Sequence, residues 1–142
     1  AIGGKRPDRE DLQAGLFFEP TVITDCDTSM RIVQEEVFGP VVTVEGFSDE
    51  AEAIRLANDS IYGLAGAVFS KDIGKAQRVA NKLKLGTVWI NDFHPYFAQA
   101  PWGGYKQSGI GRELGKEGLE EYLTSKHILT NTNPEPVNFF SK

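Results

Sequence analysis

The chain has 142 residues, of which 40% are hydrophobic and 25% are charged, and its net charge is -5 at pH 7. That composition is typical of a globular domain large enough to bury a core. It excludes an intrachain disulfide framework, because there is a single cysteine, and it shows neither the basic stripe of a nucleic-acid-binding protein nor the apolar run of a membrane span. We expect a cytoplasmic protein whose partners are neither nucleic acids nor membranes.

Strand and helix signals alternate as far as residue 90. Apolar, mostly β-branched runs bounded by turn residues predict strands at 20–23, 41–47, 65–69 and 87–90. Apolar residues at helical spacing predict helices over 30–35, 48–57 and 72–85. Ser48 and Asp72 are the expected caps of the second and third helices. This order with short connections predicts an α/β fold, an open parallel sheet with flanking helices.

The rest of the chain contains a long loop, a helix and a lone strand. The loop runs from Asn91 to about Gly111 and is rich in glycine, proline and aromatic residues, and residues 112–123 have the apolar face of a helix. Residues 126–130 are predicted to form a last strand with no partner in the chain, so we expect it to pair with another subunit in a homo-oligomer. The start at Ala1 resembles the end of a strand entering a turn, so we expect a piece of a longer polypeptide.

Several motifs resemble those of one enzyme family. The segment Gln34–Val41 contains Glu-Glu-Val-Phe-Gly-Pro and resembles the E-E-[IV]-F-G-P signature of NAD(P)-dependent aldehyde dehydrogenases. Four further segments match that family in order and spacing, and they are 15–22, 58–64, 86–91 and 103–113. The resemblance implies the C-terminal part of an aldehyde dehydrogenase catalytic domain over residues 1–125. It also implies an oligomerisation strand and tail over residues 126–142.

The first motif carries the cofactor residues that the resemblance implies. Glu36 matches the glutamate that accepts hydrogen bonds from the ribose beside the nicotinamide, and Phe38 matches the ring that packs near the nicotinamide. A carboxylate can accept from two vicinal hydroxyls, and an apolar ring can hold a flat heterocycle. On pattern alone Glu36 could equally be a solvated charge and Phe38 a core residue. The expected cofactor is NAD, with NADP open because the residues near the adenine ribose are absent.

The catalytic residues of the family have no counterpart in this chain. The family's nucleophile is a cysteine in an F-x-N-x-G-Q-x-C context, and the sequence contains no such motif. Its one cysteine, Cys26, is flanked by Asp25 and Asp27, which disfavour a thiolate, so we expect it to be structural or incidental. The nucleophile and the general-base glutamate are expected upstream, no metal ligand set is expected, and the chain alone should be inactive.

The loop after residue 91 has the composition of a pocket for an organic cation. Aromatic faces attract quaternary ammonium groups, and tryptophan does so best. Within the family the loop most resembles that of the betaine aldehyde dehydrogenases, whose aromatic box includes a tryptophan just before a Gly-Gly pair; Trp102 matches it. His94 and Tyr96 are candidate walls or gates, and His94 should be neutral when a cation binds. The alternative is that these aromatic residues, like Trp89 in its strand, serve packing alone.

Three functions remain open from the sequence. The first is a part of an enzyme that oxidises betaine aldehyde to glycine betaine, an osmoprotectant, through a cysteine thioester. The second is an aldehyde or aminoaldehyde dehydrogenase of other specificity, since aminoaldehydes are cations too. The third is an inactive oligomerisation or binding module. The resemblance also implies a weak candidate for a monovalent cation site at residues 106–109.

Overall fold

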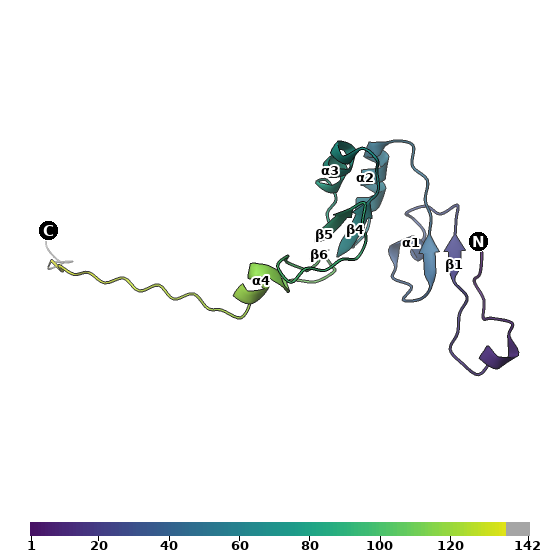
Figure 1. Cartoon of the computed structure of the whole chain (residues 1–142), viewed down its shortest axis with the longest axis horizontal. Coiled ribbons are helices and arrows are strands. Elements are labelled where there is room, and N and C mark those ends of the chain that lie inside the picture. The colour runs from purple at the N-terminus through teal and green to yellow at the C-terminus, as the bar shows by residue number, and fades with distance from the viewer. Residues whose placement is uncertain (136–142) are drawn as a thin grey trace.

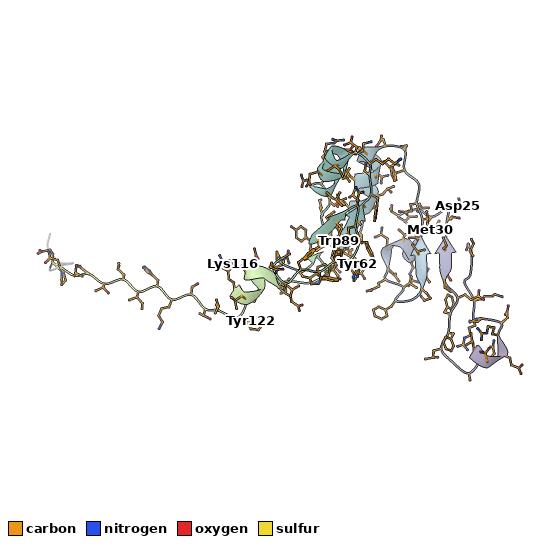
Figure 2. All side chains as sticks on the ribbon, viewed as in Figure 1. Asp25, Met30, Tyr62, Trp89, Lys116 and Tyr122 are labelled. Carbon is orange, nitrogen blue, oxygen red and sulfur yellow. The ribbon has the colours of Figure 1, made fainter. Side chains whose placement is uncertain are left out.

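The computed structural model describes residues 1–135 of an elongated molecule (Figure 1). An N-terminal part holds one pair of strands, a central body holds the longer helices and two further strand pairs, and the chain then extends away from that body. Figure 2 shows Trp89 and Tyr62 in the central body and Asp25 and Met30 in the N-terminal part. No helix within residues 1–135 has the length and apolarity needed to cross a membrane.

The N-terminal part is a parallel strand pair with a short helix between its strands. Strand β1 (Thr21–Ile23) pairs with β2 (Val41–Thr43) so that Val22 lies opposite Val42, and helix α1 (Arg31–Gln34) connects them. A single 3₁₀ turn, η1 (Glu10–Leu12), precedes β1. Runs of β-branched residues favour the extended conformation here, as the sequence predicted.

The central body is built on a second parallel pair. Strand β4 (Ala65–Val68) runs beside β5 (Thr87–Ile90), and helix α3 (Ile73–Ala80) connects them and packs on both. Ala76 of α3 is fully buried at this contact, and Trp89 of β5 is 9% exposed. Helix α2 (Glu50–Asn58) lies beside α3, and a two-bond pair from Arg78 to Glu50 at 2.8 and 2.9 Å joins the helices. That hydrogen-bonded guanidinium lowers the pKa of the Glu50 carboxyl.

Both helices begin at an aspartate. The Asp72 carboxylate accepts from the Lys75 backbone N–H at 2.9 Å, which confirms the predicted cap of α3. The cap predicted at Ser48 is wrong, because Asp49 accepts from the Glu52 N–H at 2.8 Å. Ser48 instead donates its backbone N–H and its hydroxyl to the Glu52 carboxylate. Asp49, one position further along than predicted, is therefore the cap, and the Glu52 carboxylate reaches back to the residue before it.

The region after β5 departs from the expected long helix. Strand β6 (Tyr105–Lys106) pairs antiparallel with β3 (Tyr62–Gly63), and helix α4 covers only Gly115–Glu120 rather than 112–123. Leu114 has φ +60° and Gly115 has φ +61°, and two consecutive left-handed residues cannot continue a right-handed helix. Of the helix predicted over residues 112–123, only residues 115–120 are therefore helical.

The strands form three separate pairs instead of one sheet. The predicted order of strand, helix and parallel strand is confirmed for β1-α1-β2 and for β4-α3-β5, but β2 does not pair with β4. The pattern of apolar residues predicts which segments are strands, but it does not predict which strands pair with each other. The expectation of a single open sheet within the described residues is therefore corrected to paired pieces of a parallel α/β architecture.

Much of the apolar surface of the chain is exposed. The accessible surface is 11586 Å², whereas a compact monomer of 15.6 kDa exposes about 7,000 Å². Ala76 and Trp89 are the buried hydrophobic residues within the described part of the chain. The sequence predicted a real core from length and composition, and the structure shows only this small one, because the elements present cover few of one another's apolar faces.

The segment after α4 extends without regular structure. Residues 124–135 form neither helix nor strand, so the strand predicted at 126–130 is not formed in the described chain. Ile128 and Leu129 are 77% and 83% exposed. Its pairing with another subunit stays a prediction, and the remainder of the predicted tail, residues 136–142, lies outside the described residues.

A close contact between two glycines supplies a stability prediction. A Cβ at Gly86, immediately before β5, would overlap the carbonyl oxygen of Gly103, whereas a Cβ at Gly46 would meet nothing within 4 Å. We expect Gly86→Ala to lower the free energy of unfolding by about 1–3 kcal/mol or more, since the backbones must separate. Gly46→Ala should leave it unchanged or slightly higher. Denaturant unfolding of both variants checks this, and equal stabilities would contradict the close packing.

Candidate functional site

Strand β5 supports the aromatic loop through Trp89. The strand register places Trp89 opposite Ala67 of β4, and the indole is buried against the loop that follows. Its ring N–H donates to the backbone carbonyl of Pro95 at 3.1 Å. A buried indole N–H needs such a partner. Trp89 is thus the core residue that the sequence predicted, and it also fixes one point of the loop.

The structure brings the three predicted substrate residues together on this indole. His94 stacks on Trp89 with ring centroids 5.8 Å apart, and Tyr96 and Trp102 contact it at 6.2 and 6.1 Å. Tyr96 and Trp102 also meet each other edge to face, with centroids 4.7 Å apart. The Tyr96 hydroxyl lies 3.3 Å from Nε2 of His94. We call Trp89, His94, Tyr96 and Trp102 the aromatic cluster.

The loop that carries the cluster is held by its backbone as well. Trp102 and Glu113 exchange two main-chain hydrogen bonds of 2.7 Å, and Gly115 donates to the Ala98 carbonyl at 3.0 Å. These bonds involve no side chain of the cluster. The rings can therefore be substituted without removing the main-chain contacts that place them.

Two rings of the loop lie at the edge of the cluster. Phe93 contacts Trp89 edge to face at 5.5 Å and is 64% exposed, and Phe97 is 61% exposed. Phe93 therefore packs the start of the loop against Trp89 of β5. Tyr96 is 48% exposed, so the cluster presents an open aromatic face rather than a closed core.

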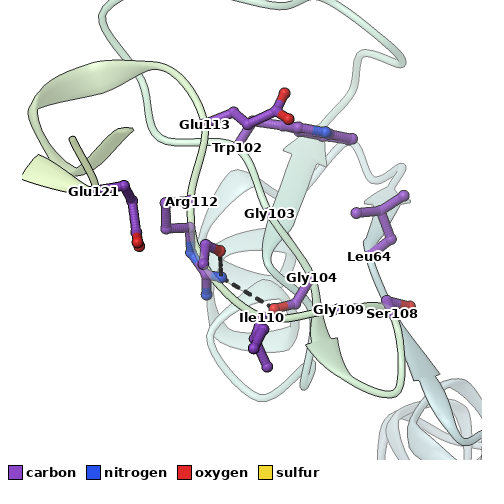
Figure 3. Close-up of a pocket in the computed structure, with 11 residues that line it drawn as sticks. Leu64, Trp102, Gly103, Gly104, Ser108, Gly109, Ile110, Arg112, Glu113 and Glu121 are labelled. Atoms are coloured by element: carbon purple, nitrogen blue, oxygen red, sulfur yellow. Dashed lines mark hydrogen bonds between the residues drawn. The ribbon is translucent and has the colours of Figure 1, made fainter. Parts of the chain in front are cut away.

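A hollow of about 370 Å³ lies beside Trp102 (Figure 3). Its lining includes the glycine-rich turn after Trp102 and the side chains of Leu64, Arg112 and Glu121. One guanidinium nitrogen of Arg112 donates to the carbonyls of Gly104 and Gly111 at 3.1 and 2.7 Å. The guanidinium carbon lies 5.5 Å from the Tyr105 ring centroid. Arg112 therefore holds the turn, and the sequence assigned it no role.

The predicted cofactor residues lie on a different element. Glu36 and Phe38 follow α1 in the turn that leads into β2, and both are exposed, Phe38 by 92%. Phe38 has φ +51°, a left-handed conformation that costs energy for a residue with a bulky side chain. The Phe38 ring is thus accessible from outside the described chain, and its role beside a nicotinamide stays a prediction.

The hollow beside Glu36 shares a wall with the hollow beside Trp102. The first has about 570 Å³ and is lined by Glu36, Tyr62 and others, and Leu64 and Ser108 line both. The Ser108 hydroxyl accepts from the Gly63 N–H at 2.9 Å, which ties the turn after β6 to β3. Sequence reasoning gave Leu64 no role and named Ser108 only within the candidate cation site at residues 106–109. An ordinary leucine or serine carries no chemical signal beyond its place in a family-like motif.

A side chain of α1 links this region to the central body. The Gln34 amide donates to the carbonyls of Thr28 and Asp59 at 2.8 and 2.9 Å. Asp59 immediately follows α2, and Lys106 of β6 donates its ammonium to the neighbouring carbonyls of Asn58 and Ser60 at 3.0 and 2.9 Å. Gln34 thus supports the segment that carries Glu36. The cation site suggested at residues 106–109 stays a prediction.

Cys26 lies apart from the residues that form these hollows. It is half-buried in the turn after β1, and its thiol lies 3.6 Å from the carbonyls of Ile23 and Thr24. No group of three or more potential metal ligands occurs among residues 1–135. Its reading as structural or incidental stays a prediction.

Comparison with known proteins gives a consistent result. The model of the aldehyde dehydrogenase family matches residues 1–128. A betaine aldehyde dehydrogenase of Bacillus subtilis is 70% identical over 139 residues, 98% of this chain and 28% of its own length. An aminoaldehyde dehydrogenase of Malus domestica, described as peroxisomal, is 55% identical over 97% of this chain and 27% of its own length.

A solved structure extends the similarity to three dimensions. The crystal structure of a betaine aldehyde dehydrogenase from Staphylococcus aureus in complex with NAD⁺ superposes with a TM-score of 0.95 and 91% sequence identity. The match covers 100% of this chain and 28% of that protein. The chain thus spans little more than a quarter of the length of these relatives.

The hydrogen bond from Trp89 gives a prediction for the loop. Trp89→Phe keeps a ring beneath the cluster but removes the donor to the Pro95 carbonyl, so we expect a loss of about 1–2 kcal/mol in stability and faster cleavage of the loop by protease. Phe97→Leu, in the same loop, should change stability by less than about 0.5 kcal/mol. Thermal unfolding and limited proteolysis test both. Equal protease resistance of Trp89→Phe and the unmutated protein would show that the indole does not anchor the loop.

Proposed function

The chain belongs to the aldehyde dehydrogenase family, and from that membership we propose that it is part of a betaine aldehyde dehydrogenase. The complete enzyme oxidises betaine aldehyde to glycine betaine through a thioester on a cysteine that is not among these 142 residues. NAD, when bound, accepts the hydride. This chain supplies the aromatic side of the substrate pocket and the ribose side of the cofactor site. The observation that carries the proposal is the contact of Tyr96 with Trp102 above Trp89.

The aromatic cluster suits a quaternary ammonium ion. A trimethylammonium group donates no conventional N–H hydrogen bond, so ring faces with their negative quadrupole are its best partners. The perpendicular packing of Tyr96 and Trp102, at 76°, offers two differently oriented aromatic surfaces. His94 stacks on Trp89 at the same place, where a positive charge would repel the substrate. We therefore assign substrate contact to Trp102, Tyr96 and a neutral His94.

The residues of the first motif fit a nicotinamide nucleotide. Glu36 borders an open hollow and can accept hydrogen bonds from the ribose hydroxyls, while the exposed ring of Phe38 can pack near the nicotinamide. Gln34 fixes the preceding residues through its two carbonyl contacts. Leu64 and Ser108 border both hollows, so they separate the ribose from the substrate side. NAD is the assigned cofactor, and NADP is the alternative.

The C-terminal segment is assigned to assembly. We propose that residues 126–142 are the oligomerisation element of a homodimer or homotetramer and that residues 1–125 are the partial catalytic domain. The exposure of Ile128 and Leu129 in an extended segment supports this, because such a segment gains from pairing with a sheet edge. We place the enzyme in the cytoplasm.

An aminoaldehyde dehydrogenase is the second candidate. The 55% identity with such an enzyme from Malus domestica supports it, and aminoaldehydes are also cations. A primary ammonium differs from trimethylammonium in donating hydrogen bonds, so it gains from carboxylate or carbonyl acceptors as well as from rings. The two candidates are distinguished by the ratio of kcat/KM for a trimethylammonium aldehyde and a primary aminoaldehyde.

Substitution of Trp102 tests the substrate assignment. In the complete enzyme, Trp102→Ala should lower kcat/KM for betaine aldehyde by roughly 1–2 kcal/mol more than for its neutral tert-butyl isostere, because the cation–π contact is lost. Trp102→Phe should lose less. Following NADH formation with both aldehydes measures this. Equal losses for the two aldehydes would show that Trp102 serves packing.

Substitution of Glu36 tests the cofactor assignment. Glu36→Gln replaces a charged acceptor and should weaken NAD binding by about 1.5–3 kcal/mol, seen as a higher KM for NAD at nearly unchanged thermal stability. Glu35→Gln is the matched control, because Glu35 bonds Arg31 through two contacts of 2.8 Å on the surface. An equal rise of KM in both variants, or none in either, would refute the role of Glu36.

A further inference from the structure

The asparagine that follows β5 makes a pair of side-chain hydrogen bonds with the segment that follows β4. The side-chain oxygen of Asn91 accepts from the Ser70 backbone N–H at 2.8 Å, and its side-chain nitrogen donates to the Ser70 carbonyl at 2.8 Å. Its own backbone N–H donates to the Val68 carbonyl at 2.9 Å. We call the two side-chain bonds to Ser70 the Asn91 clamp.

At the point where the strands end, the Asn91 side chain makes the hydrogen bonds that main-chain groups make within the strand pair. Asn91 has φ +54°, so the backbone turns away from β4 immediately after the last ladder bond. The Asn91 side-chain amide then satisfies the backbone N–H and carbonyl of Ser70, which main-chain groups of a longer β5 would otherwise have bonded. Asparagine suits this position twice, because it tolerates the left-handed conformation and carries one donor and one acceptor.

The direction that the backbone takes here decides where the cluster lies. His94 and Tyr96 are three and five residues further along, and between them the Pro95 carbonyl is bound by the Trp89 indole. The start of the loop is thus fixed at two points, by the clamp and by the indole. Release of the first point leaves the rings free to turn about the second, and a shift of roughly 1 Å at a binding surface can cost a large factor in rate.

We propose that Asn91 is a positioning residue that sets the preference for a cationic aldehyde. It does so without touching the substrate, by fixing the path of the main chain from β5 into the aromatic loop. This inference rests on the proposed function for its substrate, but the geometry of the loop can be measured without any substrate.

A second asparagine of the same chain provides a matched control. The side chain of Asn58, at the end of α2, accepts from the Lys84 N–H at 2.7 Å and donates to the Lys82 carbonyl at 2.9 Å. The Asn58 amide therefore makes the same two kinds of main-chain bond, but it holds the connection between α3 and β5 and not the aromatic loop. Any general effect of breaking such a clamp appears equally in variants of both residues.

The experiment compares Asn91→Asp with Asn58→Asp in the complete enzyme. Aspartate keeps the acceptor and removes the donor in each case. We expect Asn91→Asp to lower the ratio of kcat/KM for betaine aldehyde over its tert-butyl isostere by roughly 10-fold, whereas Asn58→Asp leaves that ratio unchanged. Asn91→Gly, which tolerates the same φ and loses both bonds, should change the ratio in the same direction. An unchanged ratio in Asn91→Gly, or equal changes in the two aspartate variants, would overturn the proposal.

Hydrogen–deuterium exchange separates this inference from the proposed function. We expect the backbone amides of residues 92–102 to exchange roughly 10-fold faster in both Asn91 variants than in Asn58→Asp. If the unmutated enzyme does not prefer the cationic aldehyde, the proposed substrate is wrong, and exchange alone decides whether Asn91 positions the loop. Equal exchange in all the enzymes would show that it does not.

Discussion

The parallel pairing of β4 with β5 is the constraint from which the rest of the site follows. Pairing of Ala67 with Trp89 places an indole between the strands and the loop, and pairing of Val68 with Ile90 brings Asn91 beside Ser70. Helix α3 covers the strand pair and buries Ala76. The aromatic cluster is thus built upon two short strands, whose register decides which side chain faces the loop.

That constraint acts in a chain that leaves most of its apolar surface uncovered. Two-stranded sheets are marginally stable unless further strands or helices cover them. Here β1 and β2 form one such pair, and apolar residues in β2 and just after it, such as Val42, Val44 and Phe47, are exposed. The similarity to proteins more than three times as long agrees with this surface, since a longer chain has more elements with which to bury it.

The proposed chemistry divides between two regions that share a wall. Glu36 and Phe38 present a charged acceptor and an apolar ring on the N-terminal part, while Tyr96 and Trp102 present aromatic faces on the central body. Leu64 and Ser108 border both the hollow beside Glu36 and the hollow beside Trp102. Because different elements carry the two proposed sites, we expect the proposed cation specificity and nucleotide affinity to be alterable independently.

The sequence by itself determined the family and the longer strands and helices, and it predicted the residue types of the site. Periodicity located β4, α3 and β5 and the motif around Glu36, since these depend on local propensity and on short spacings. It also marked Trp102 by its place before two glycines. It could not determine strand pairing, so one sheet was expected where three pairs occur, and it placed the cap of α2 one residue early and extended α4 too far.

Only the tertiary structure decided which side chains act together. It placed Trp89 beneath His94, Tyr96 and Trp102, and it placed the Asn91 amide against Ser70. Such contacts join residues on different elements, and their geometry follows from register and from single left-handed residues such as Asn91. Neither the strand register nor the position of a left-handed residue is encoded in a local pattern, because each results from the balance of many distant contacts.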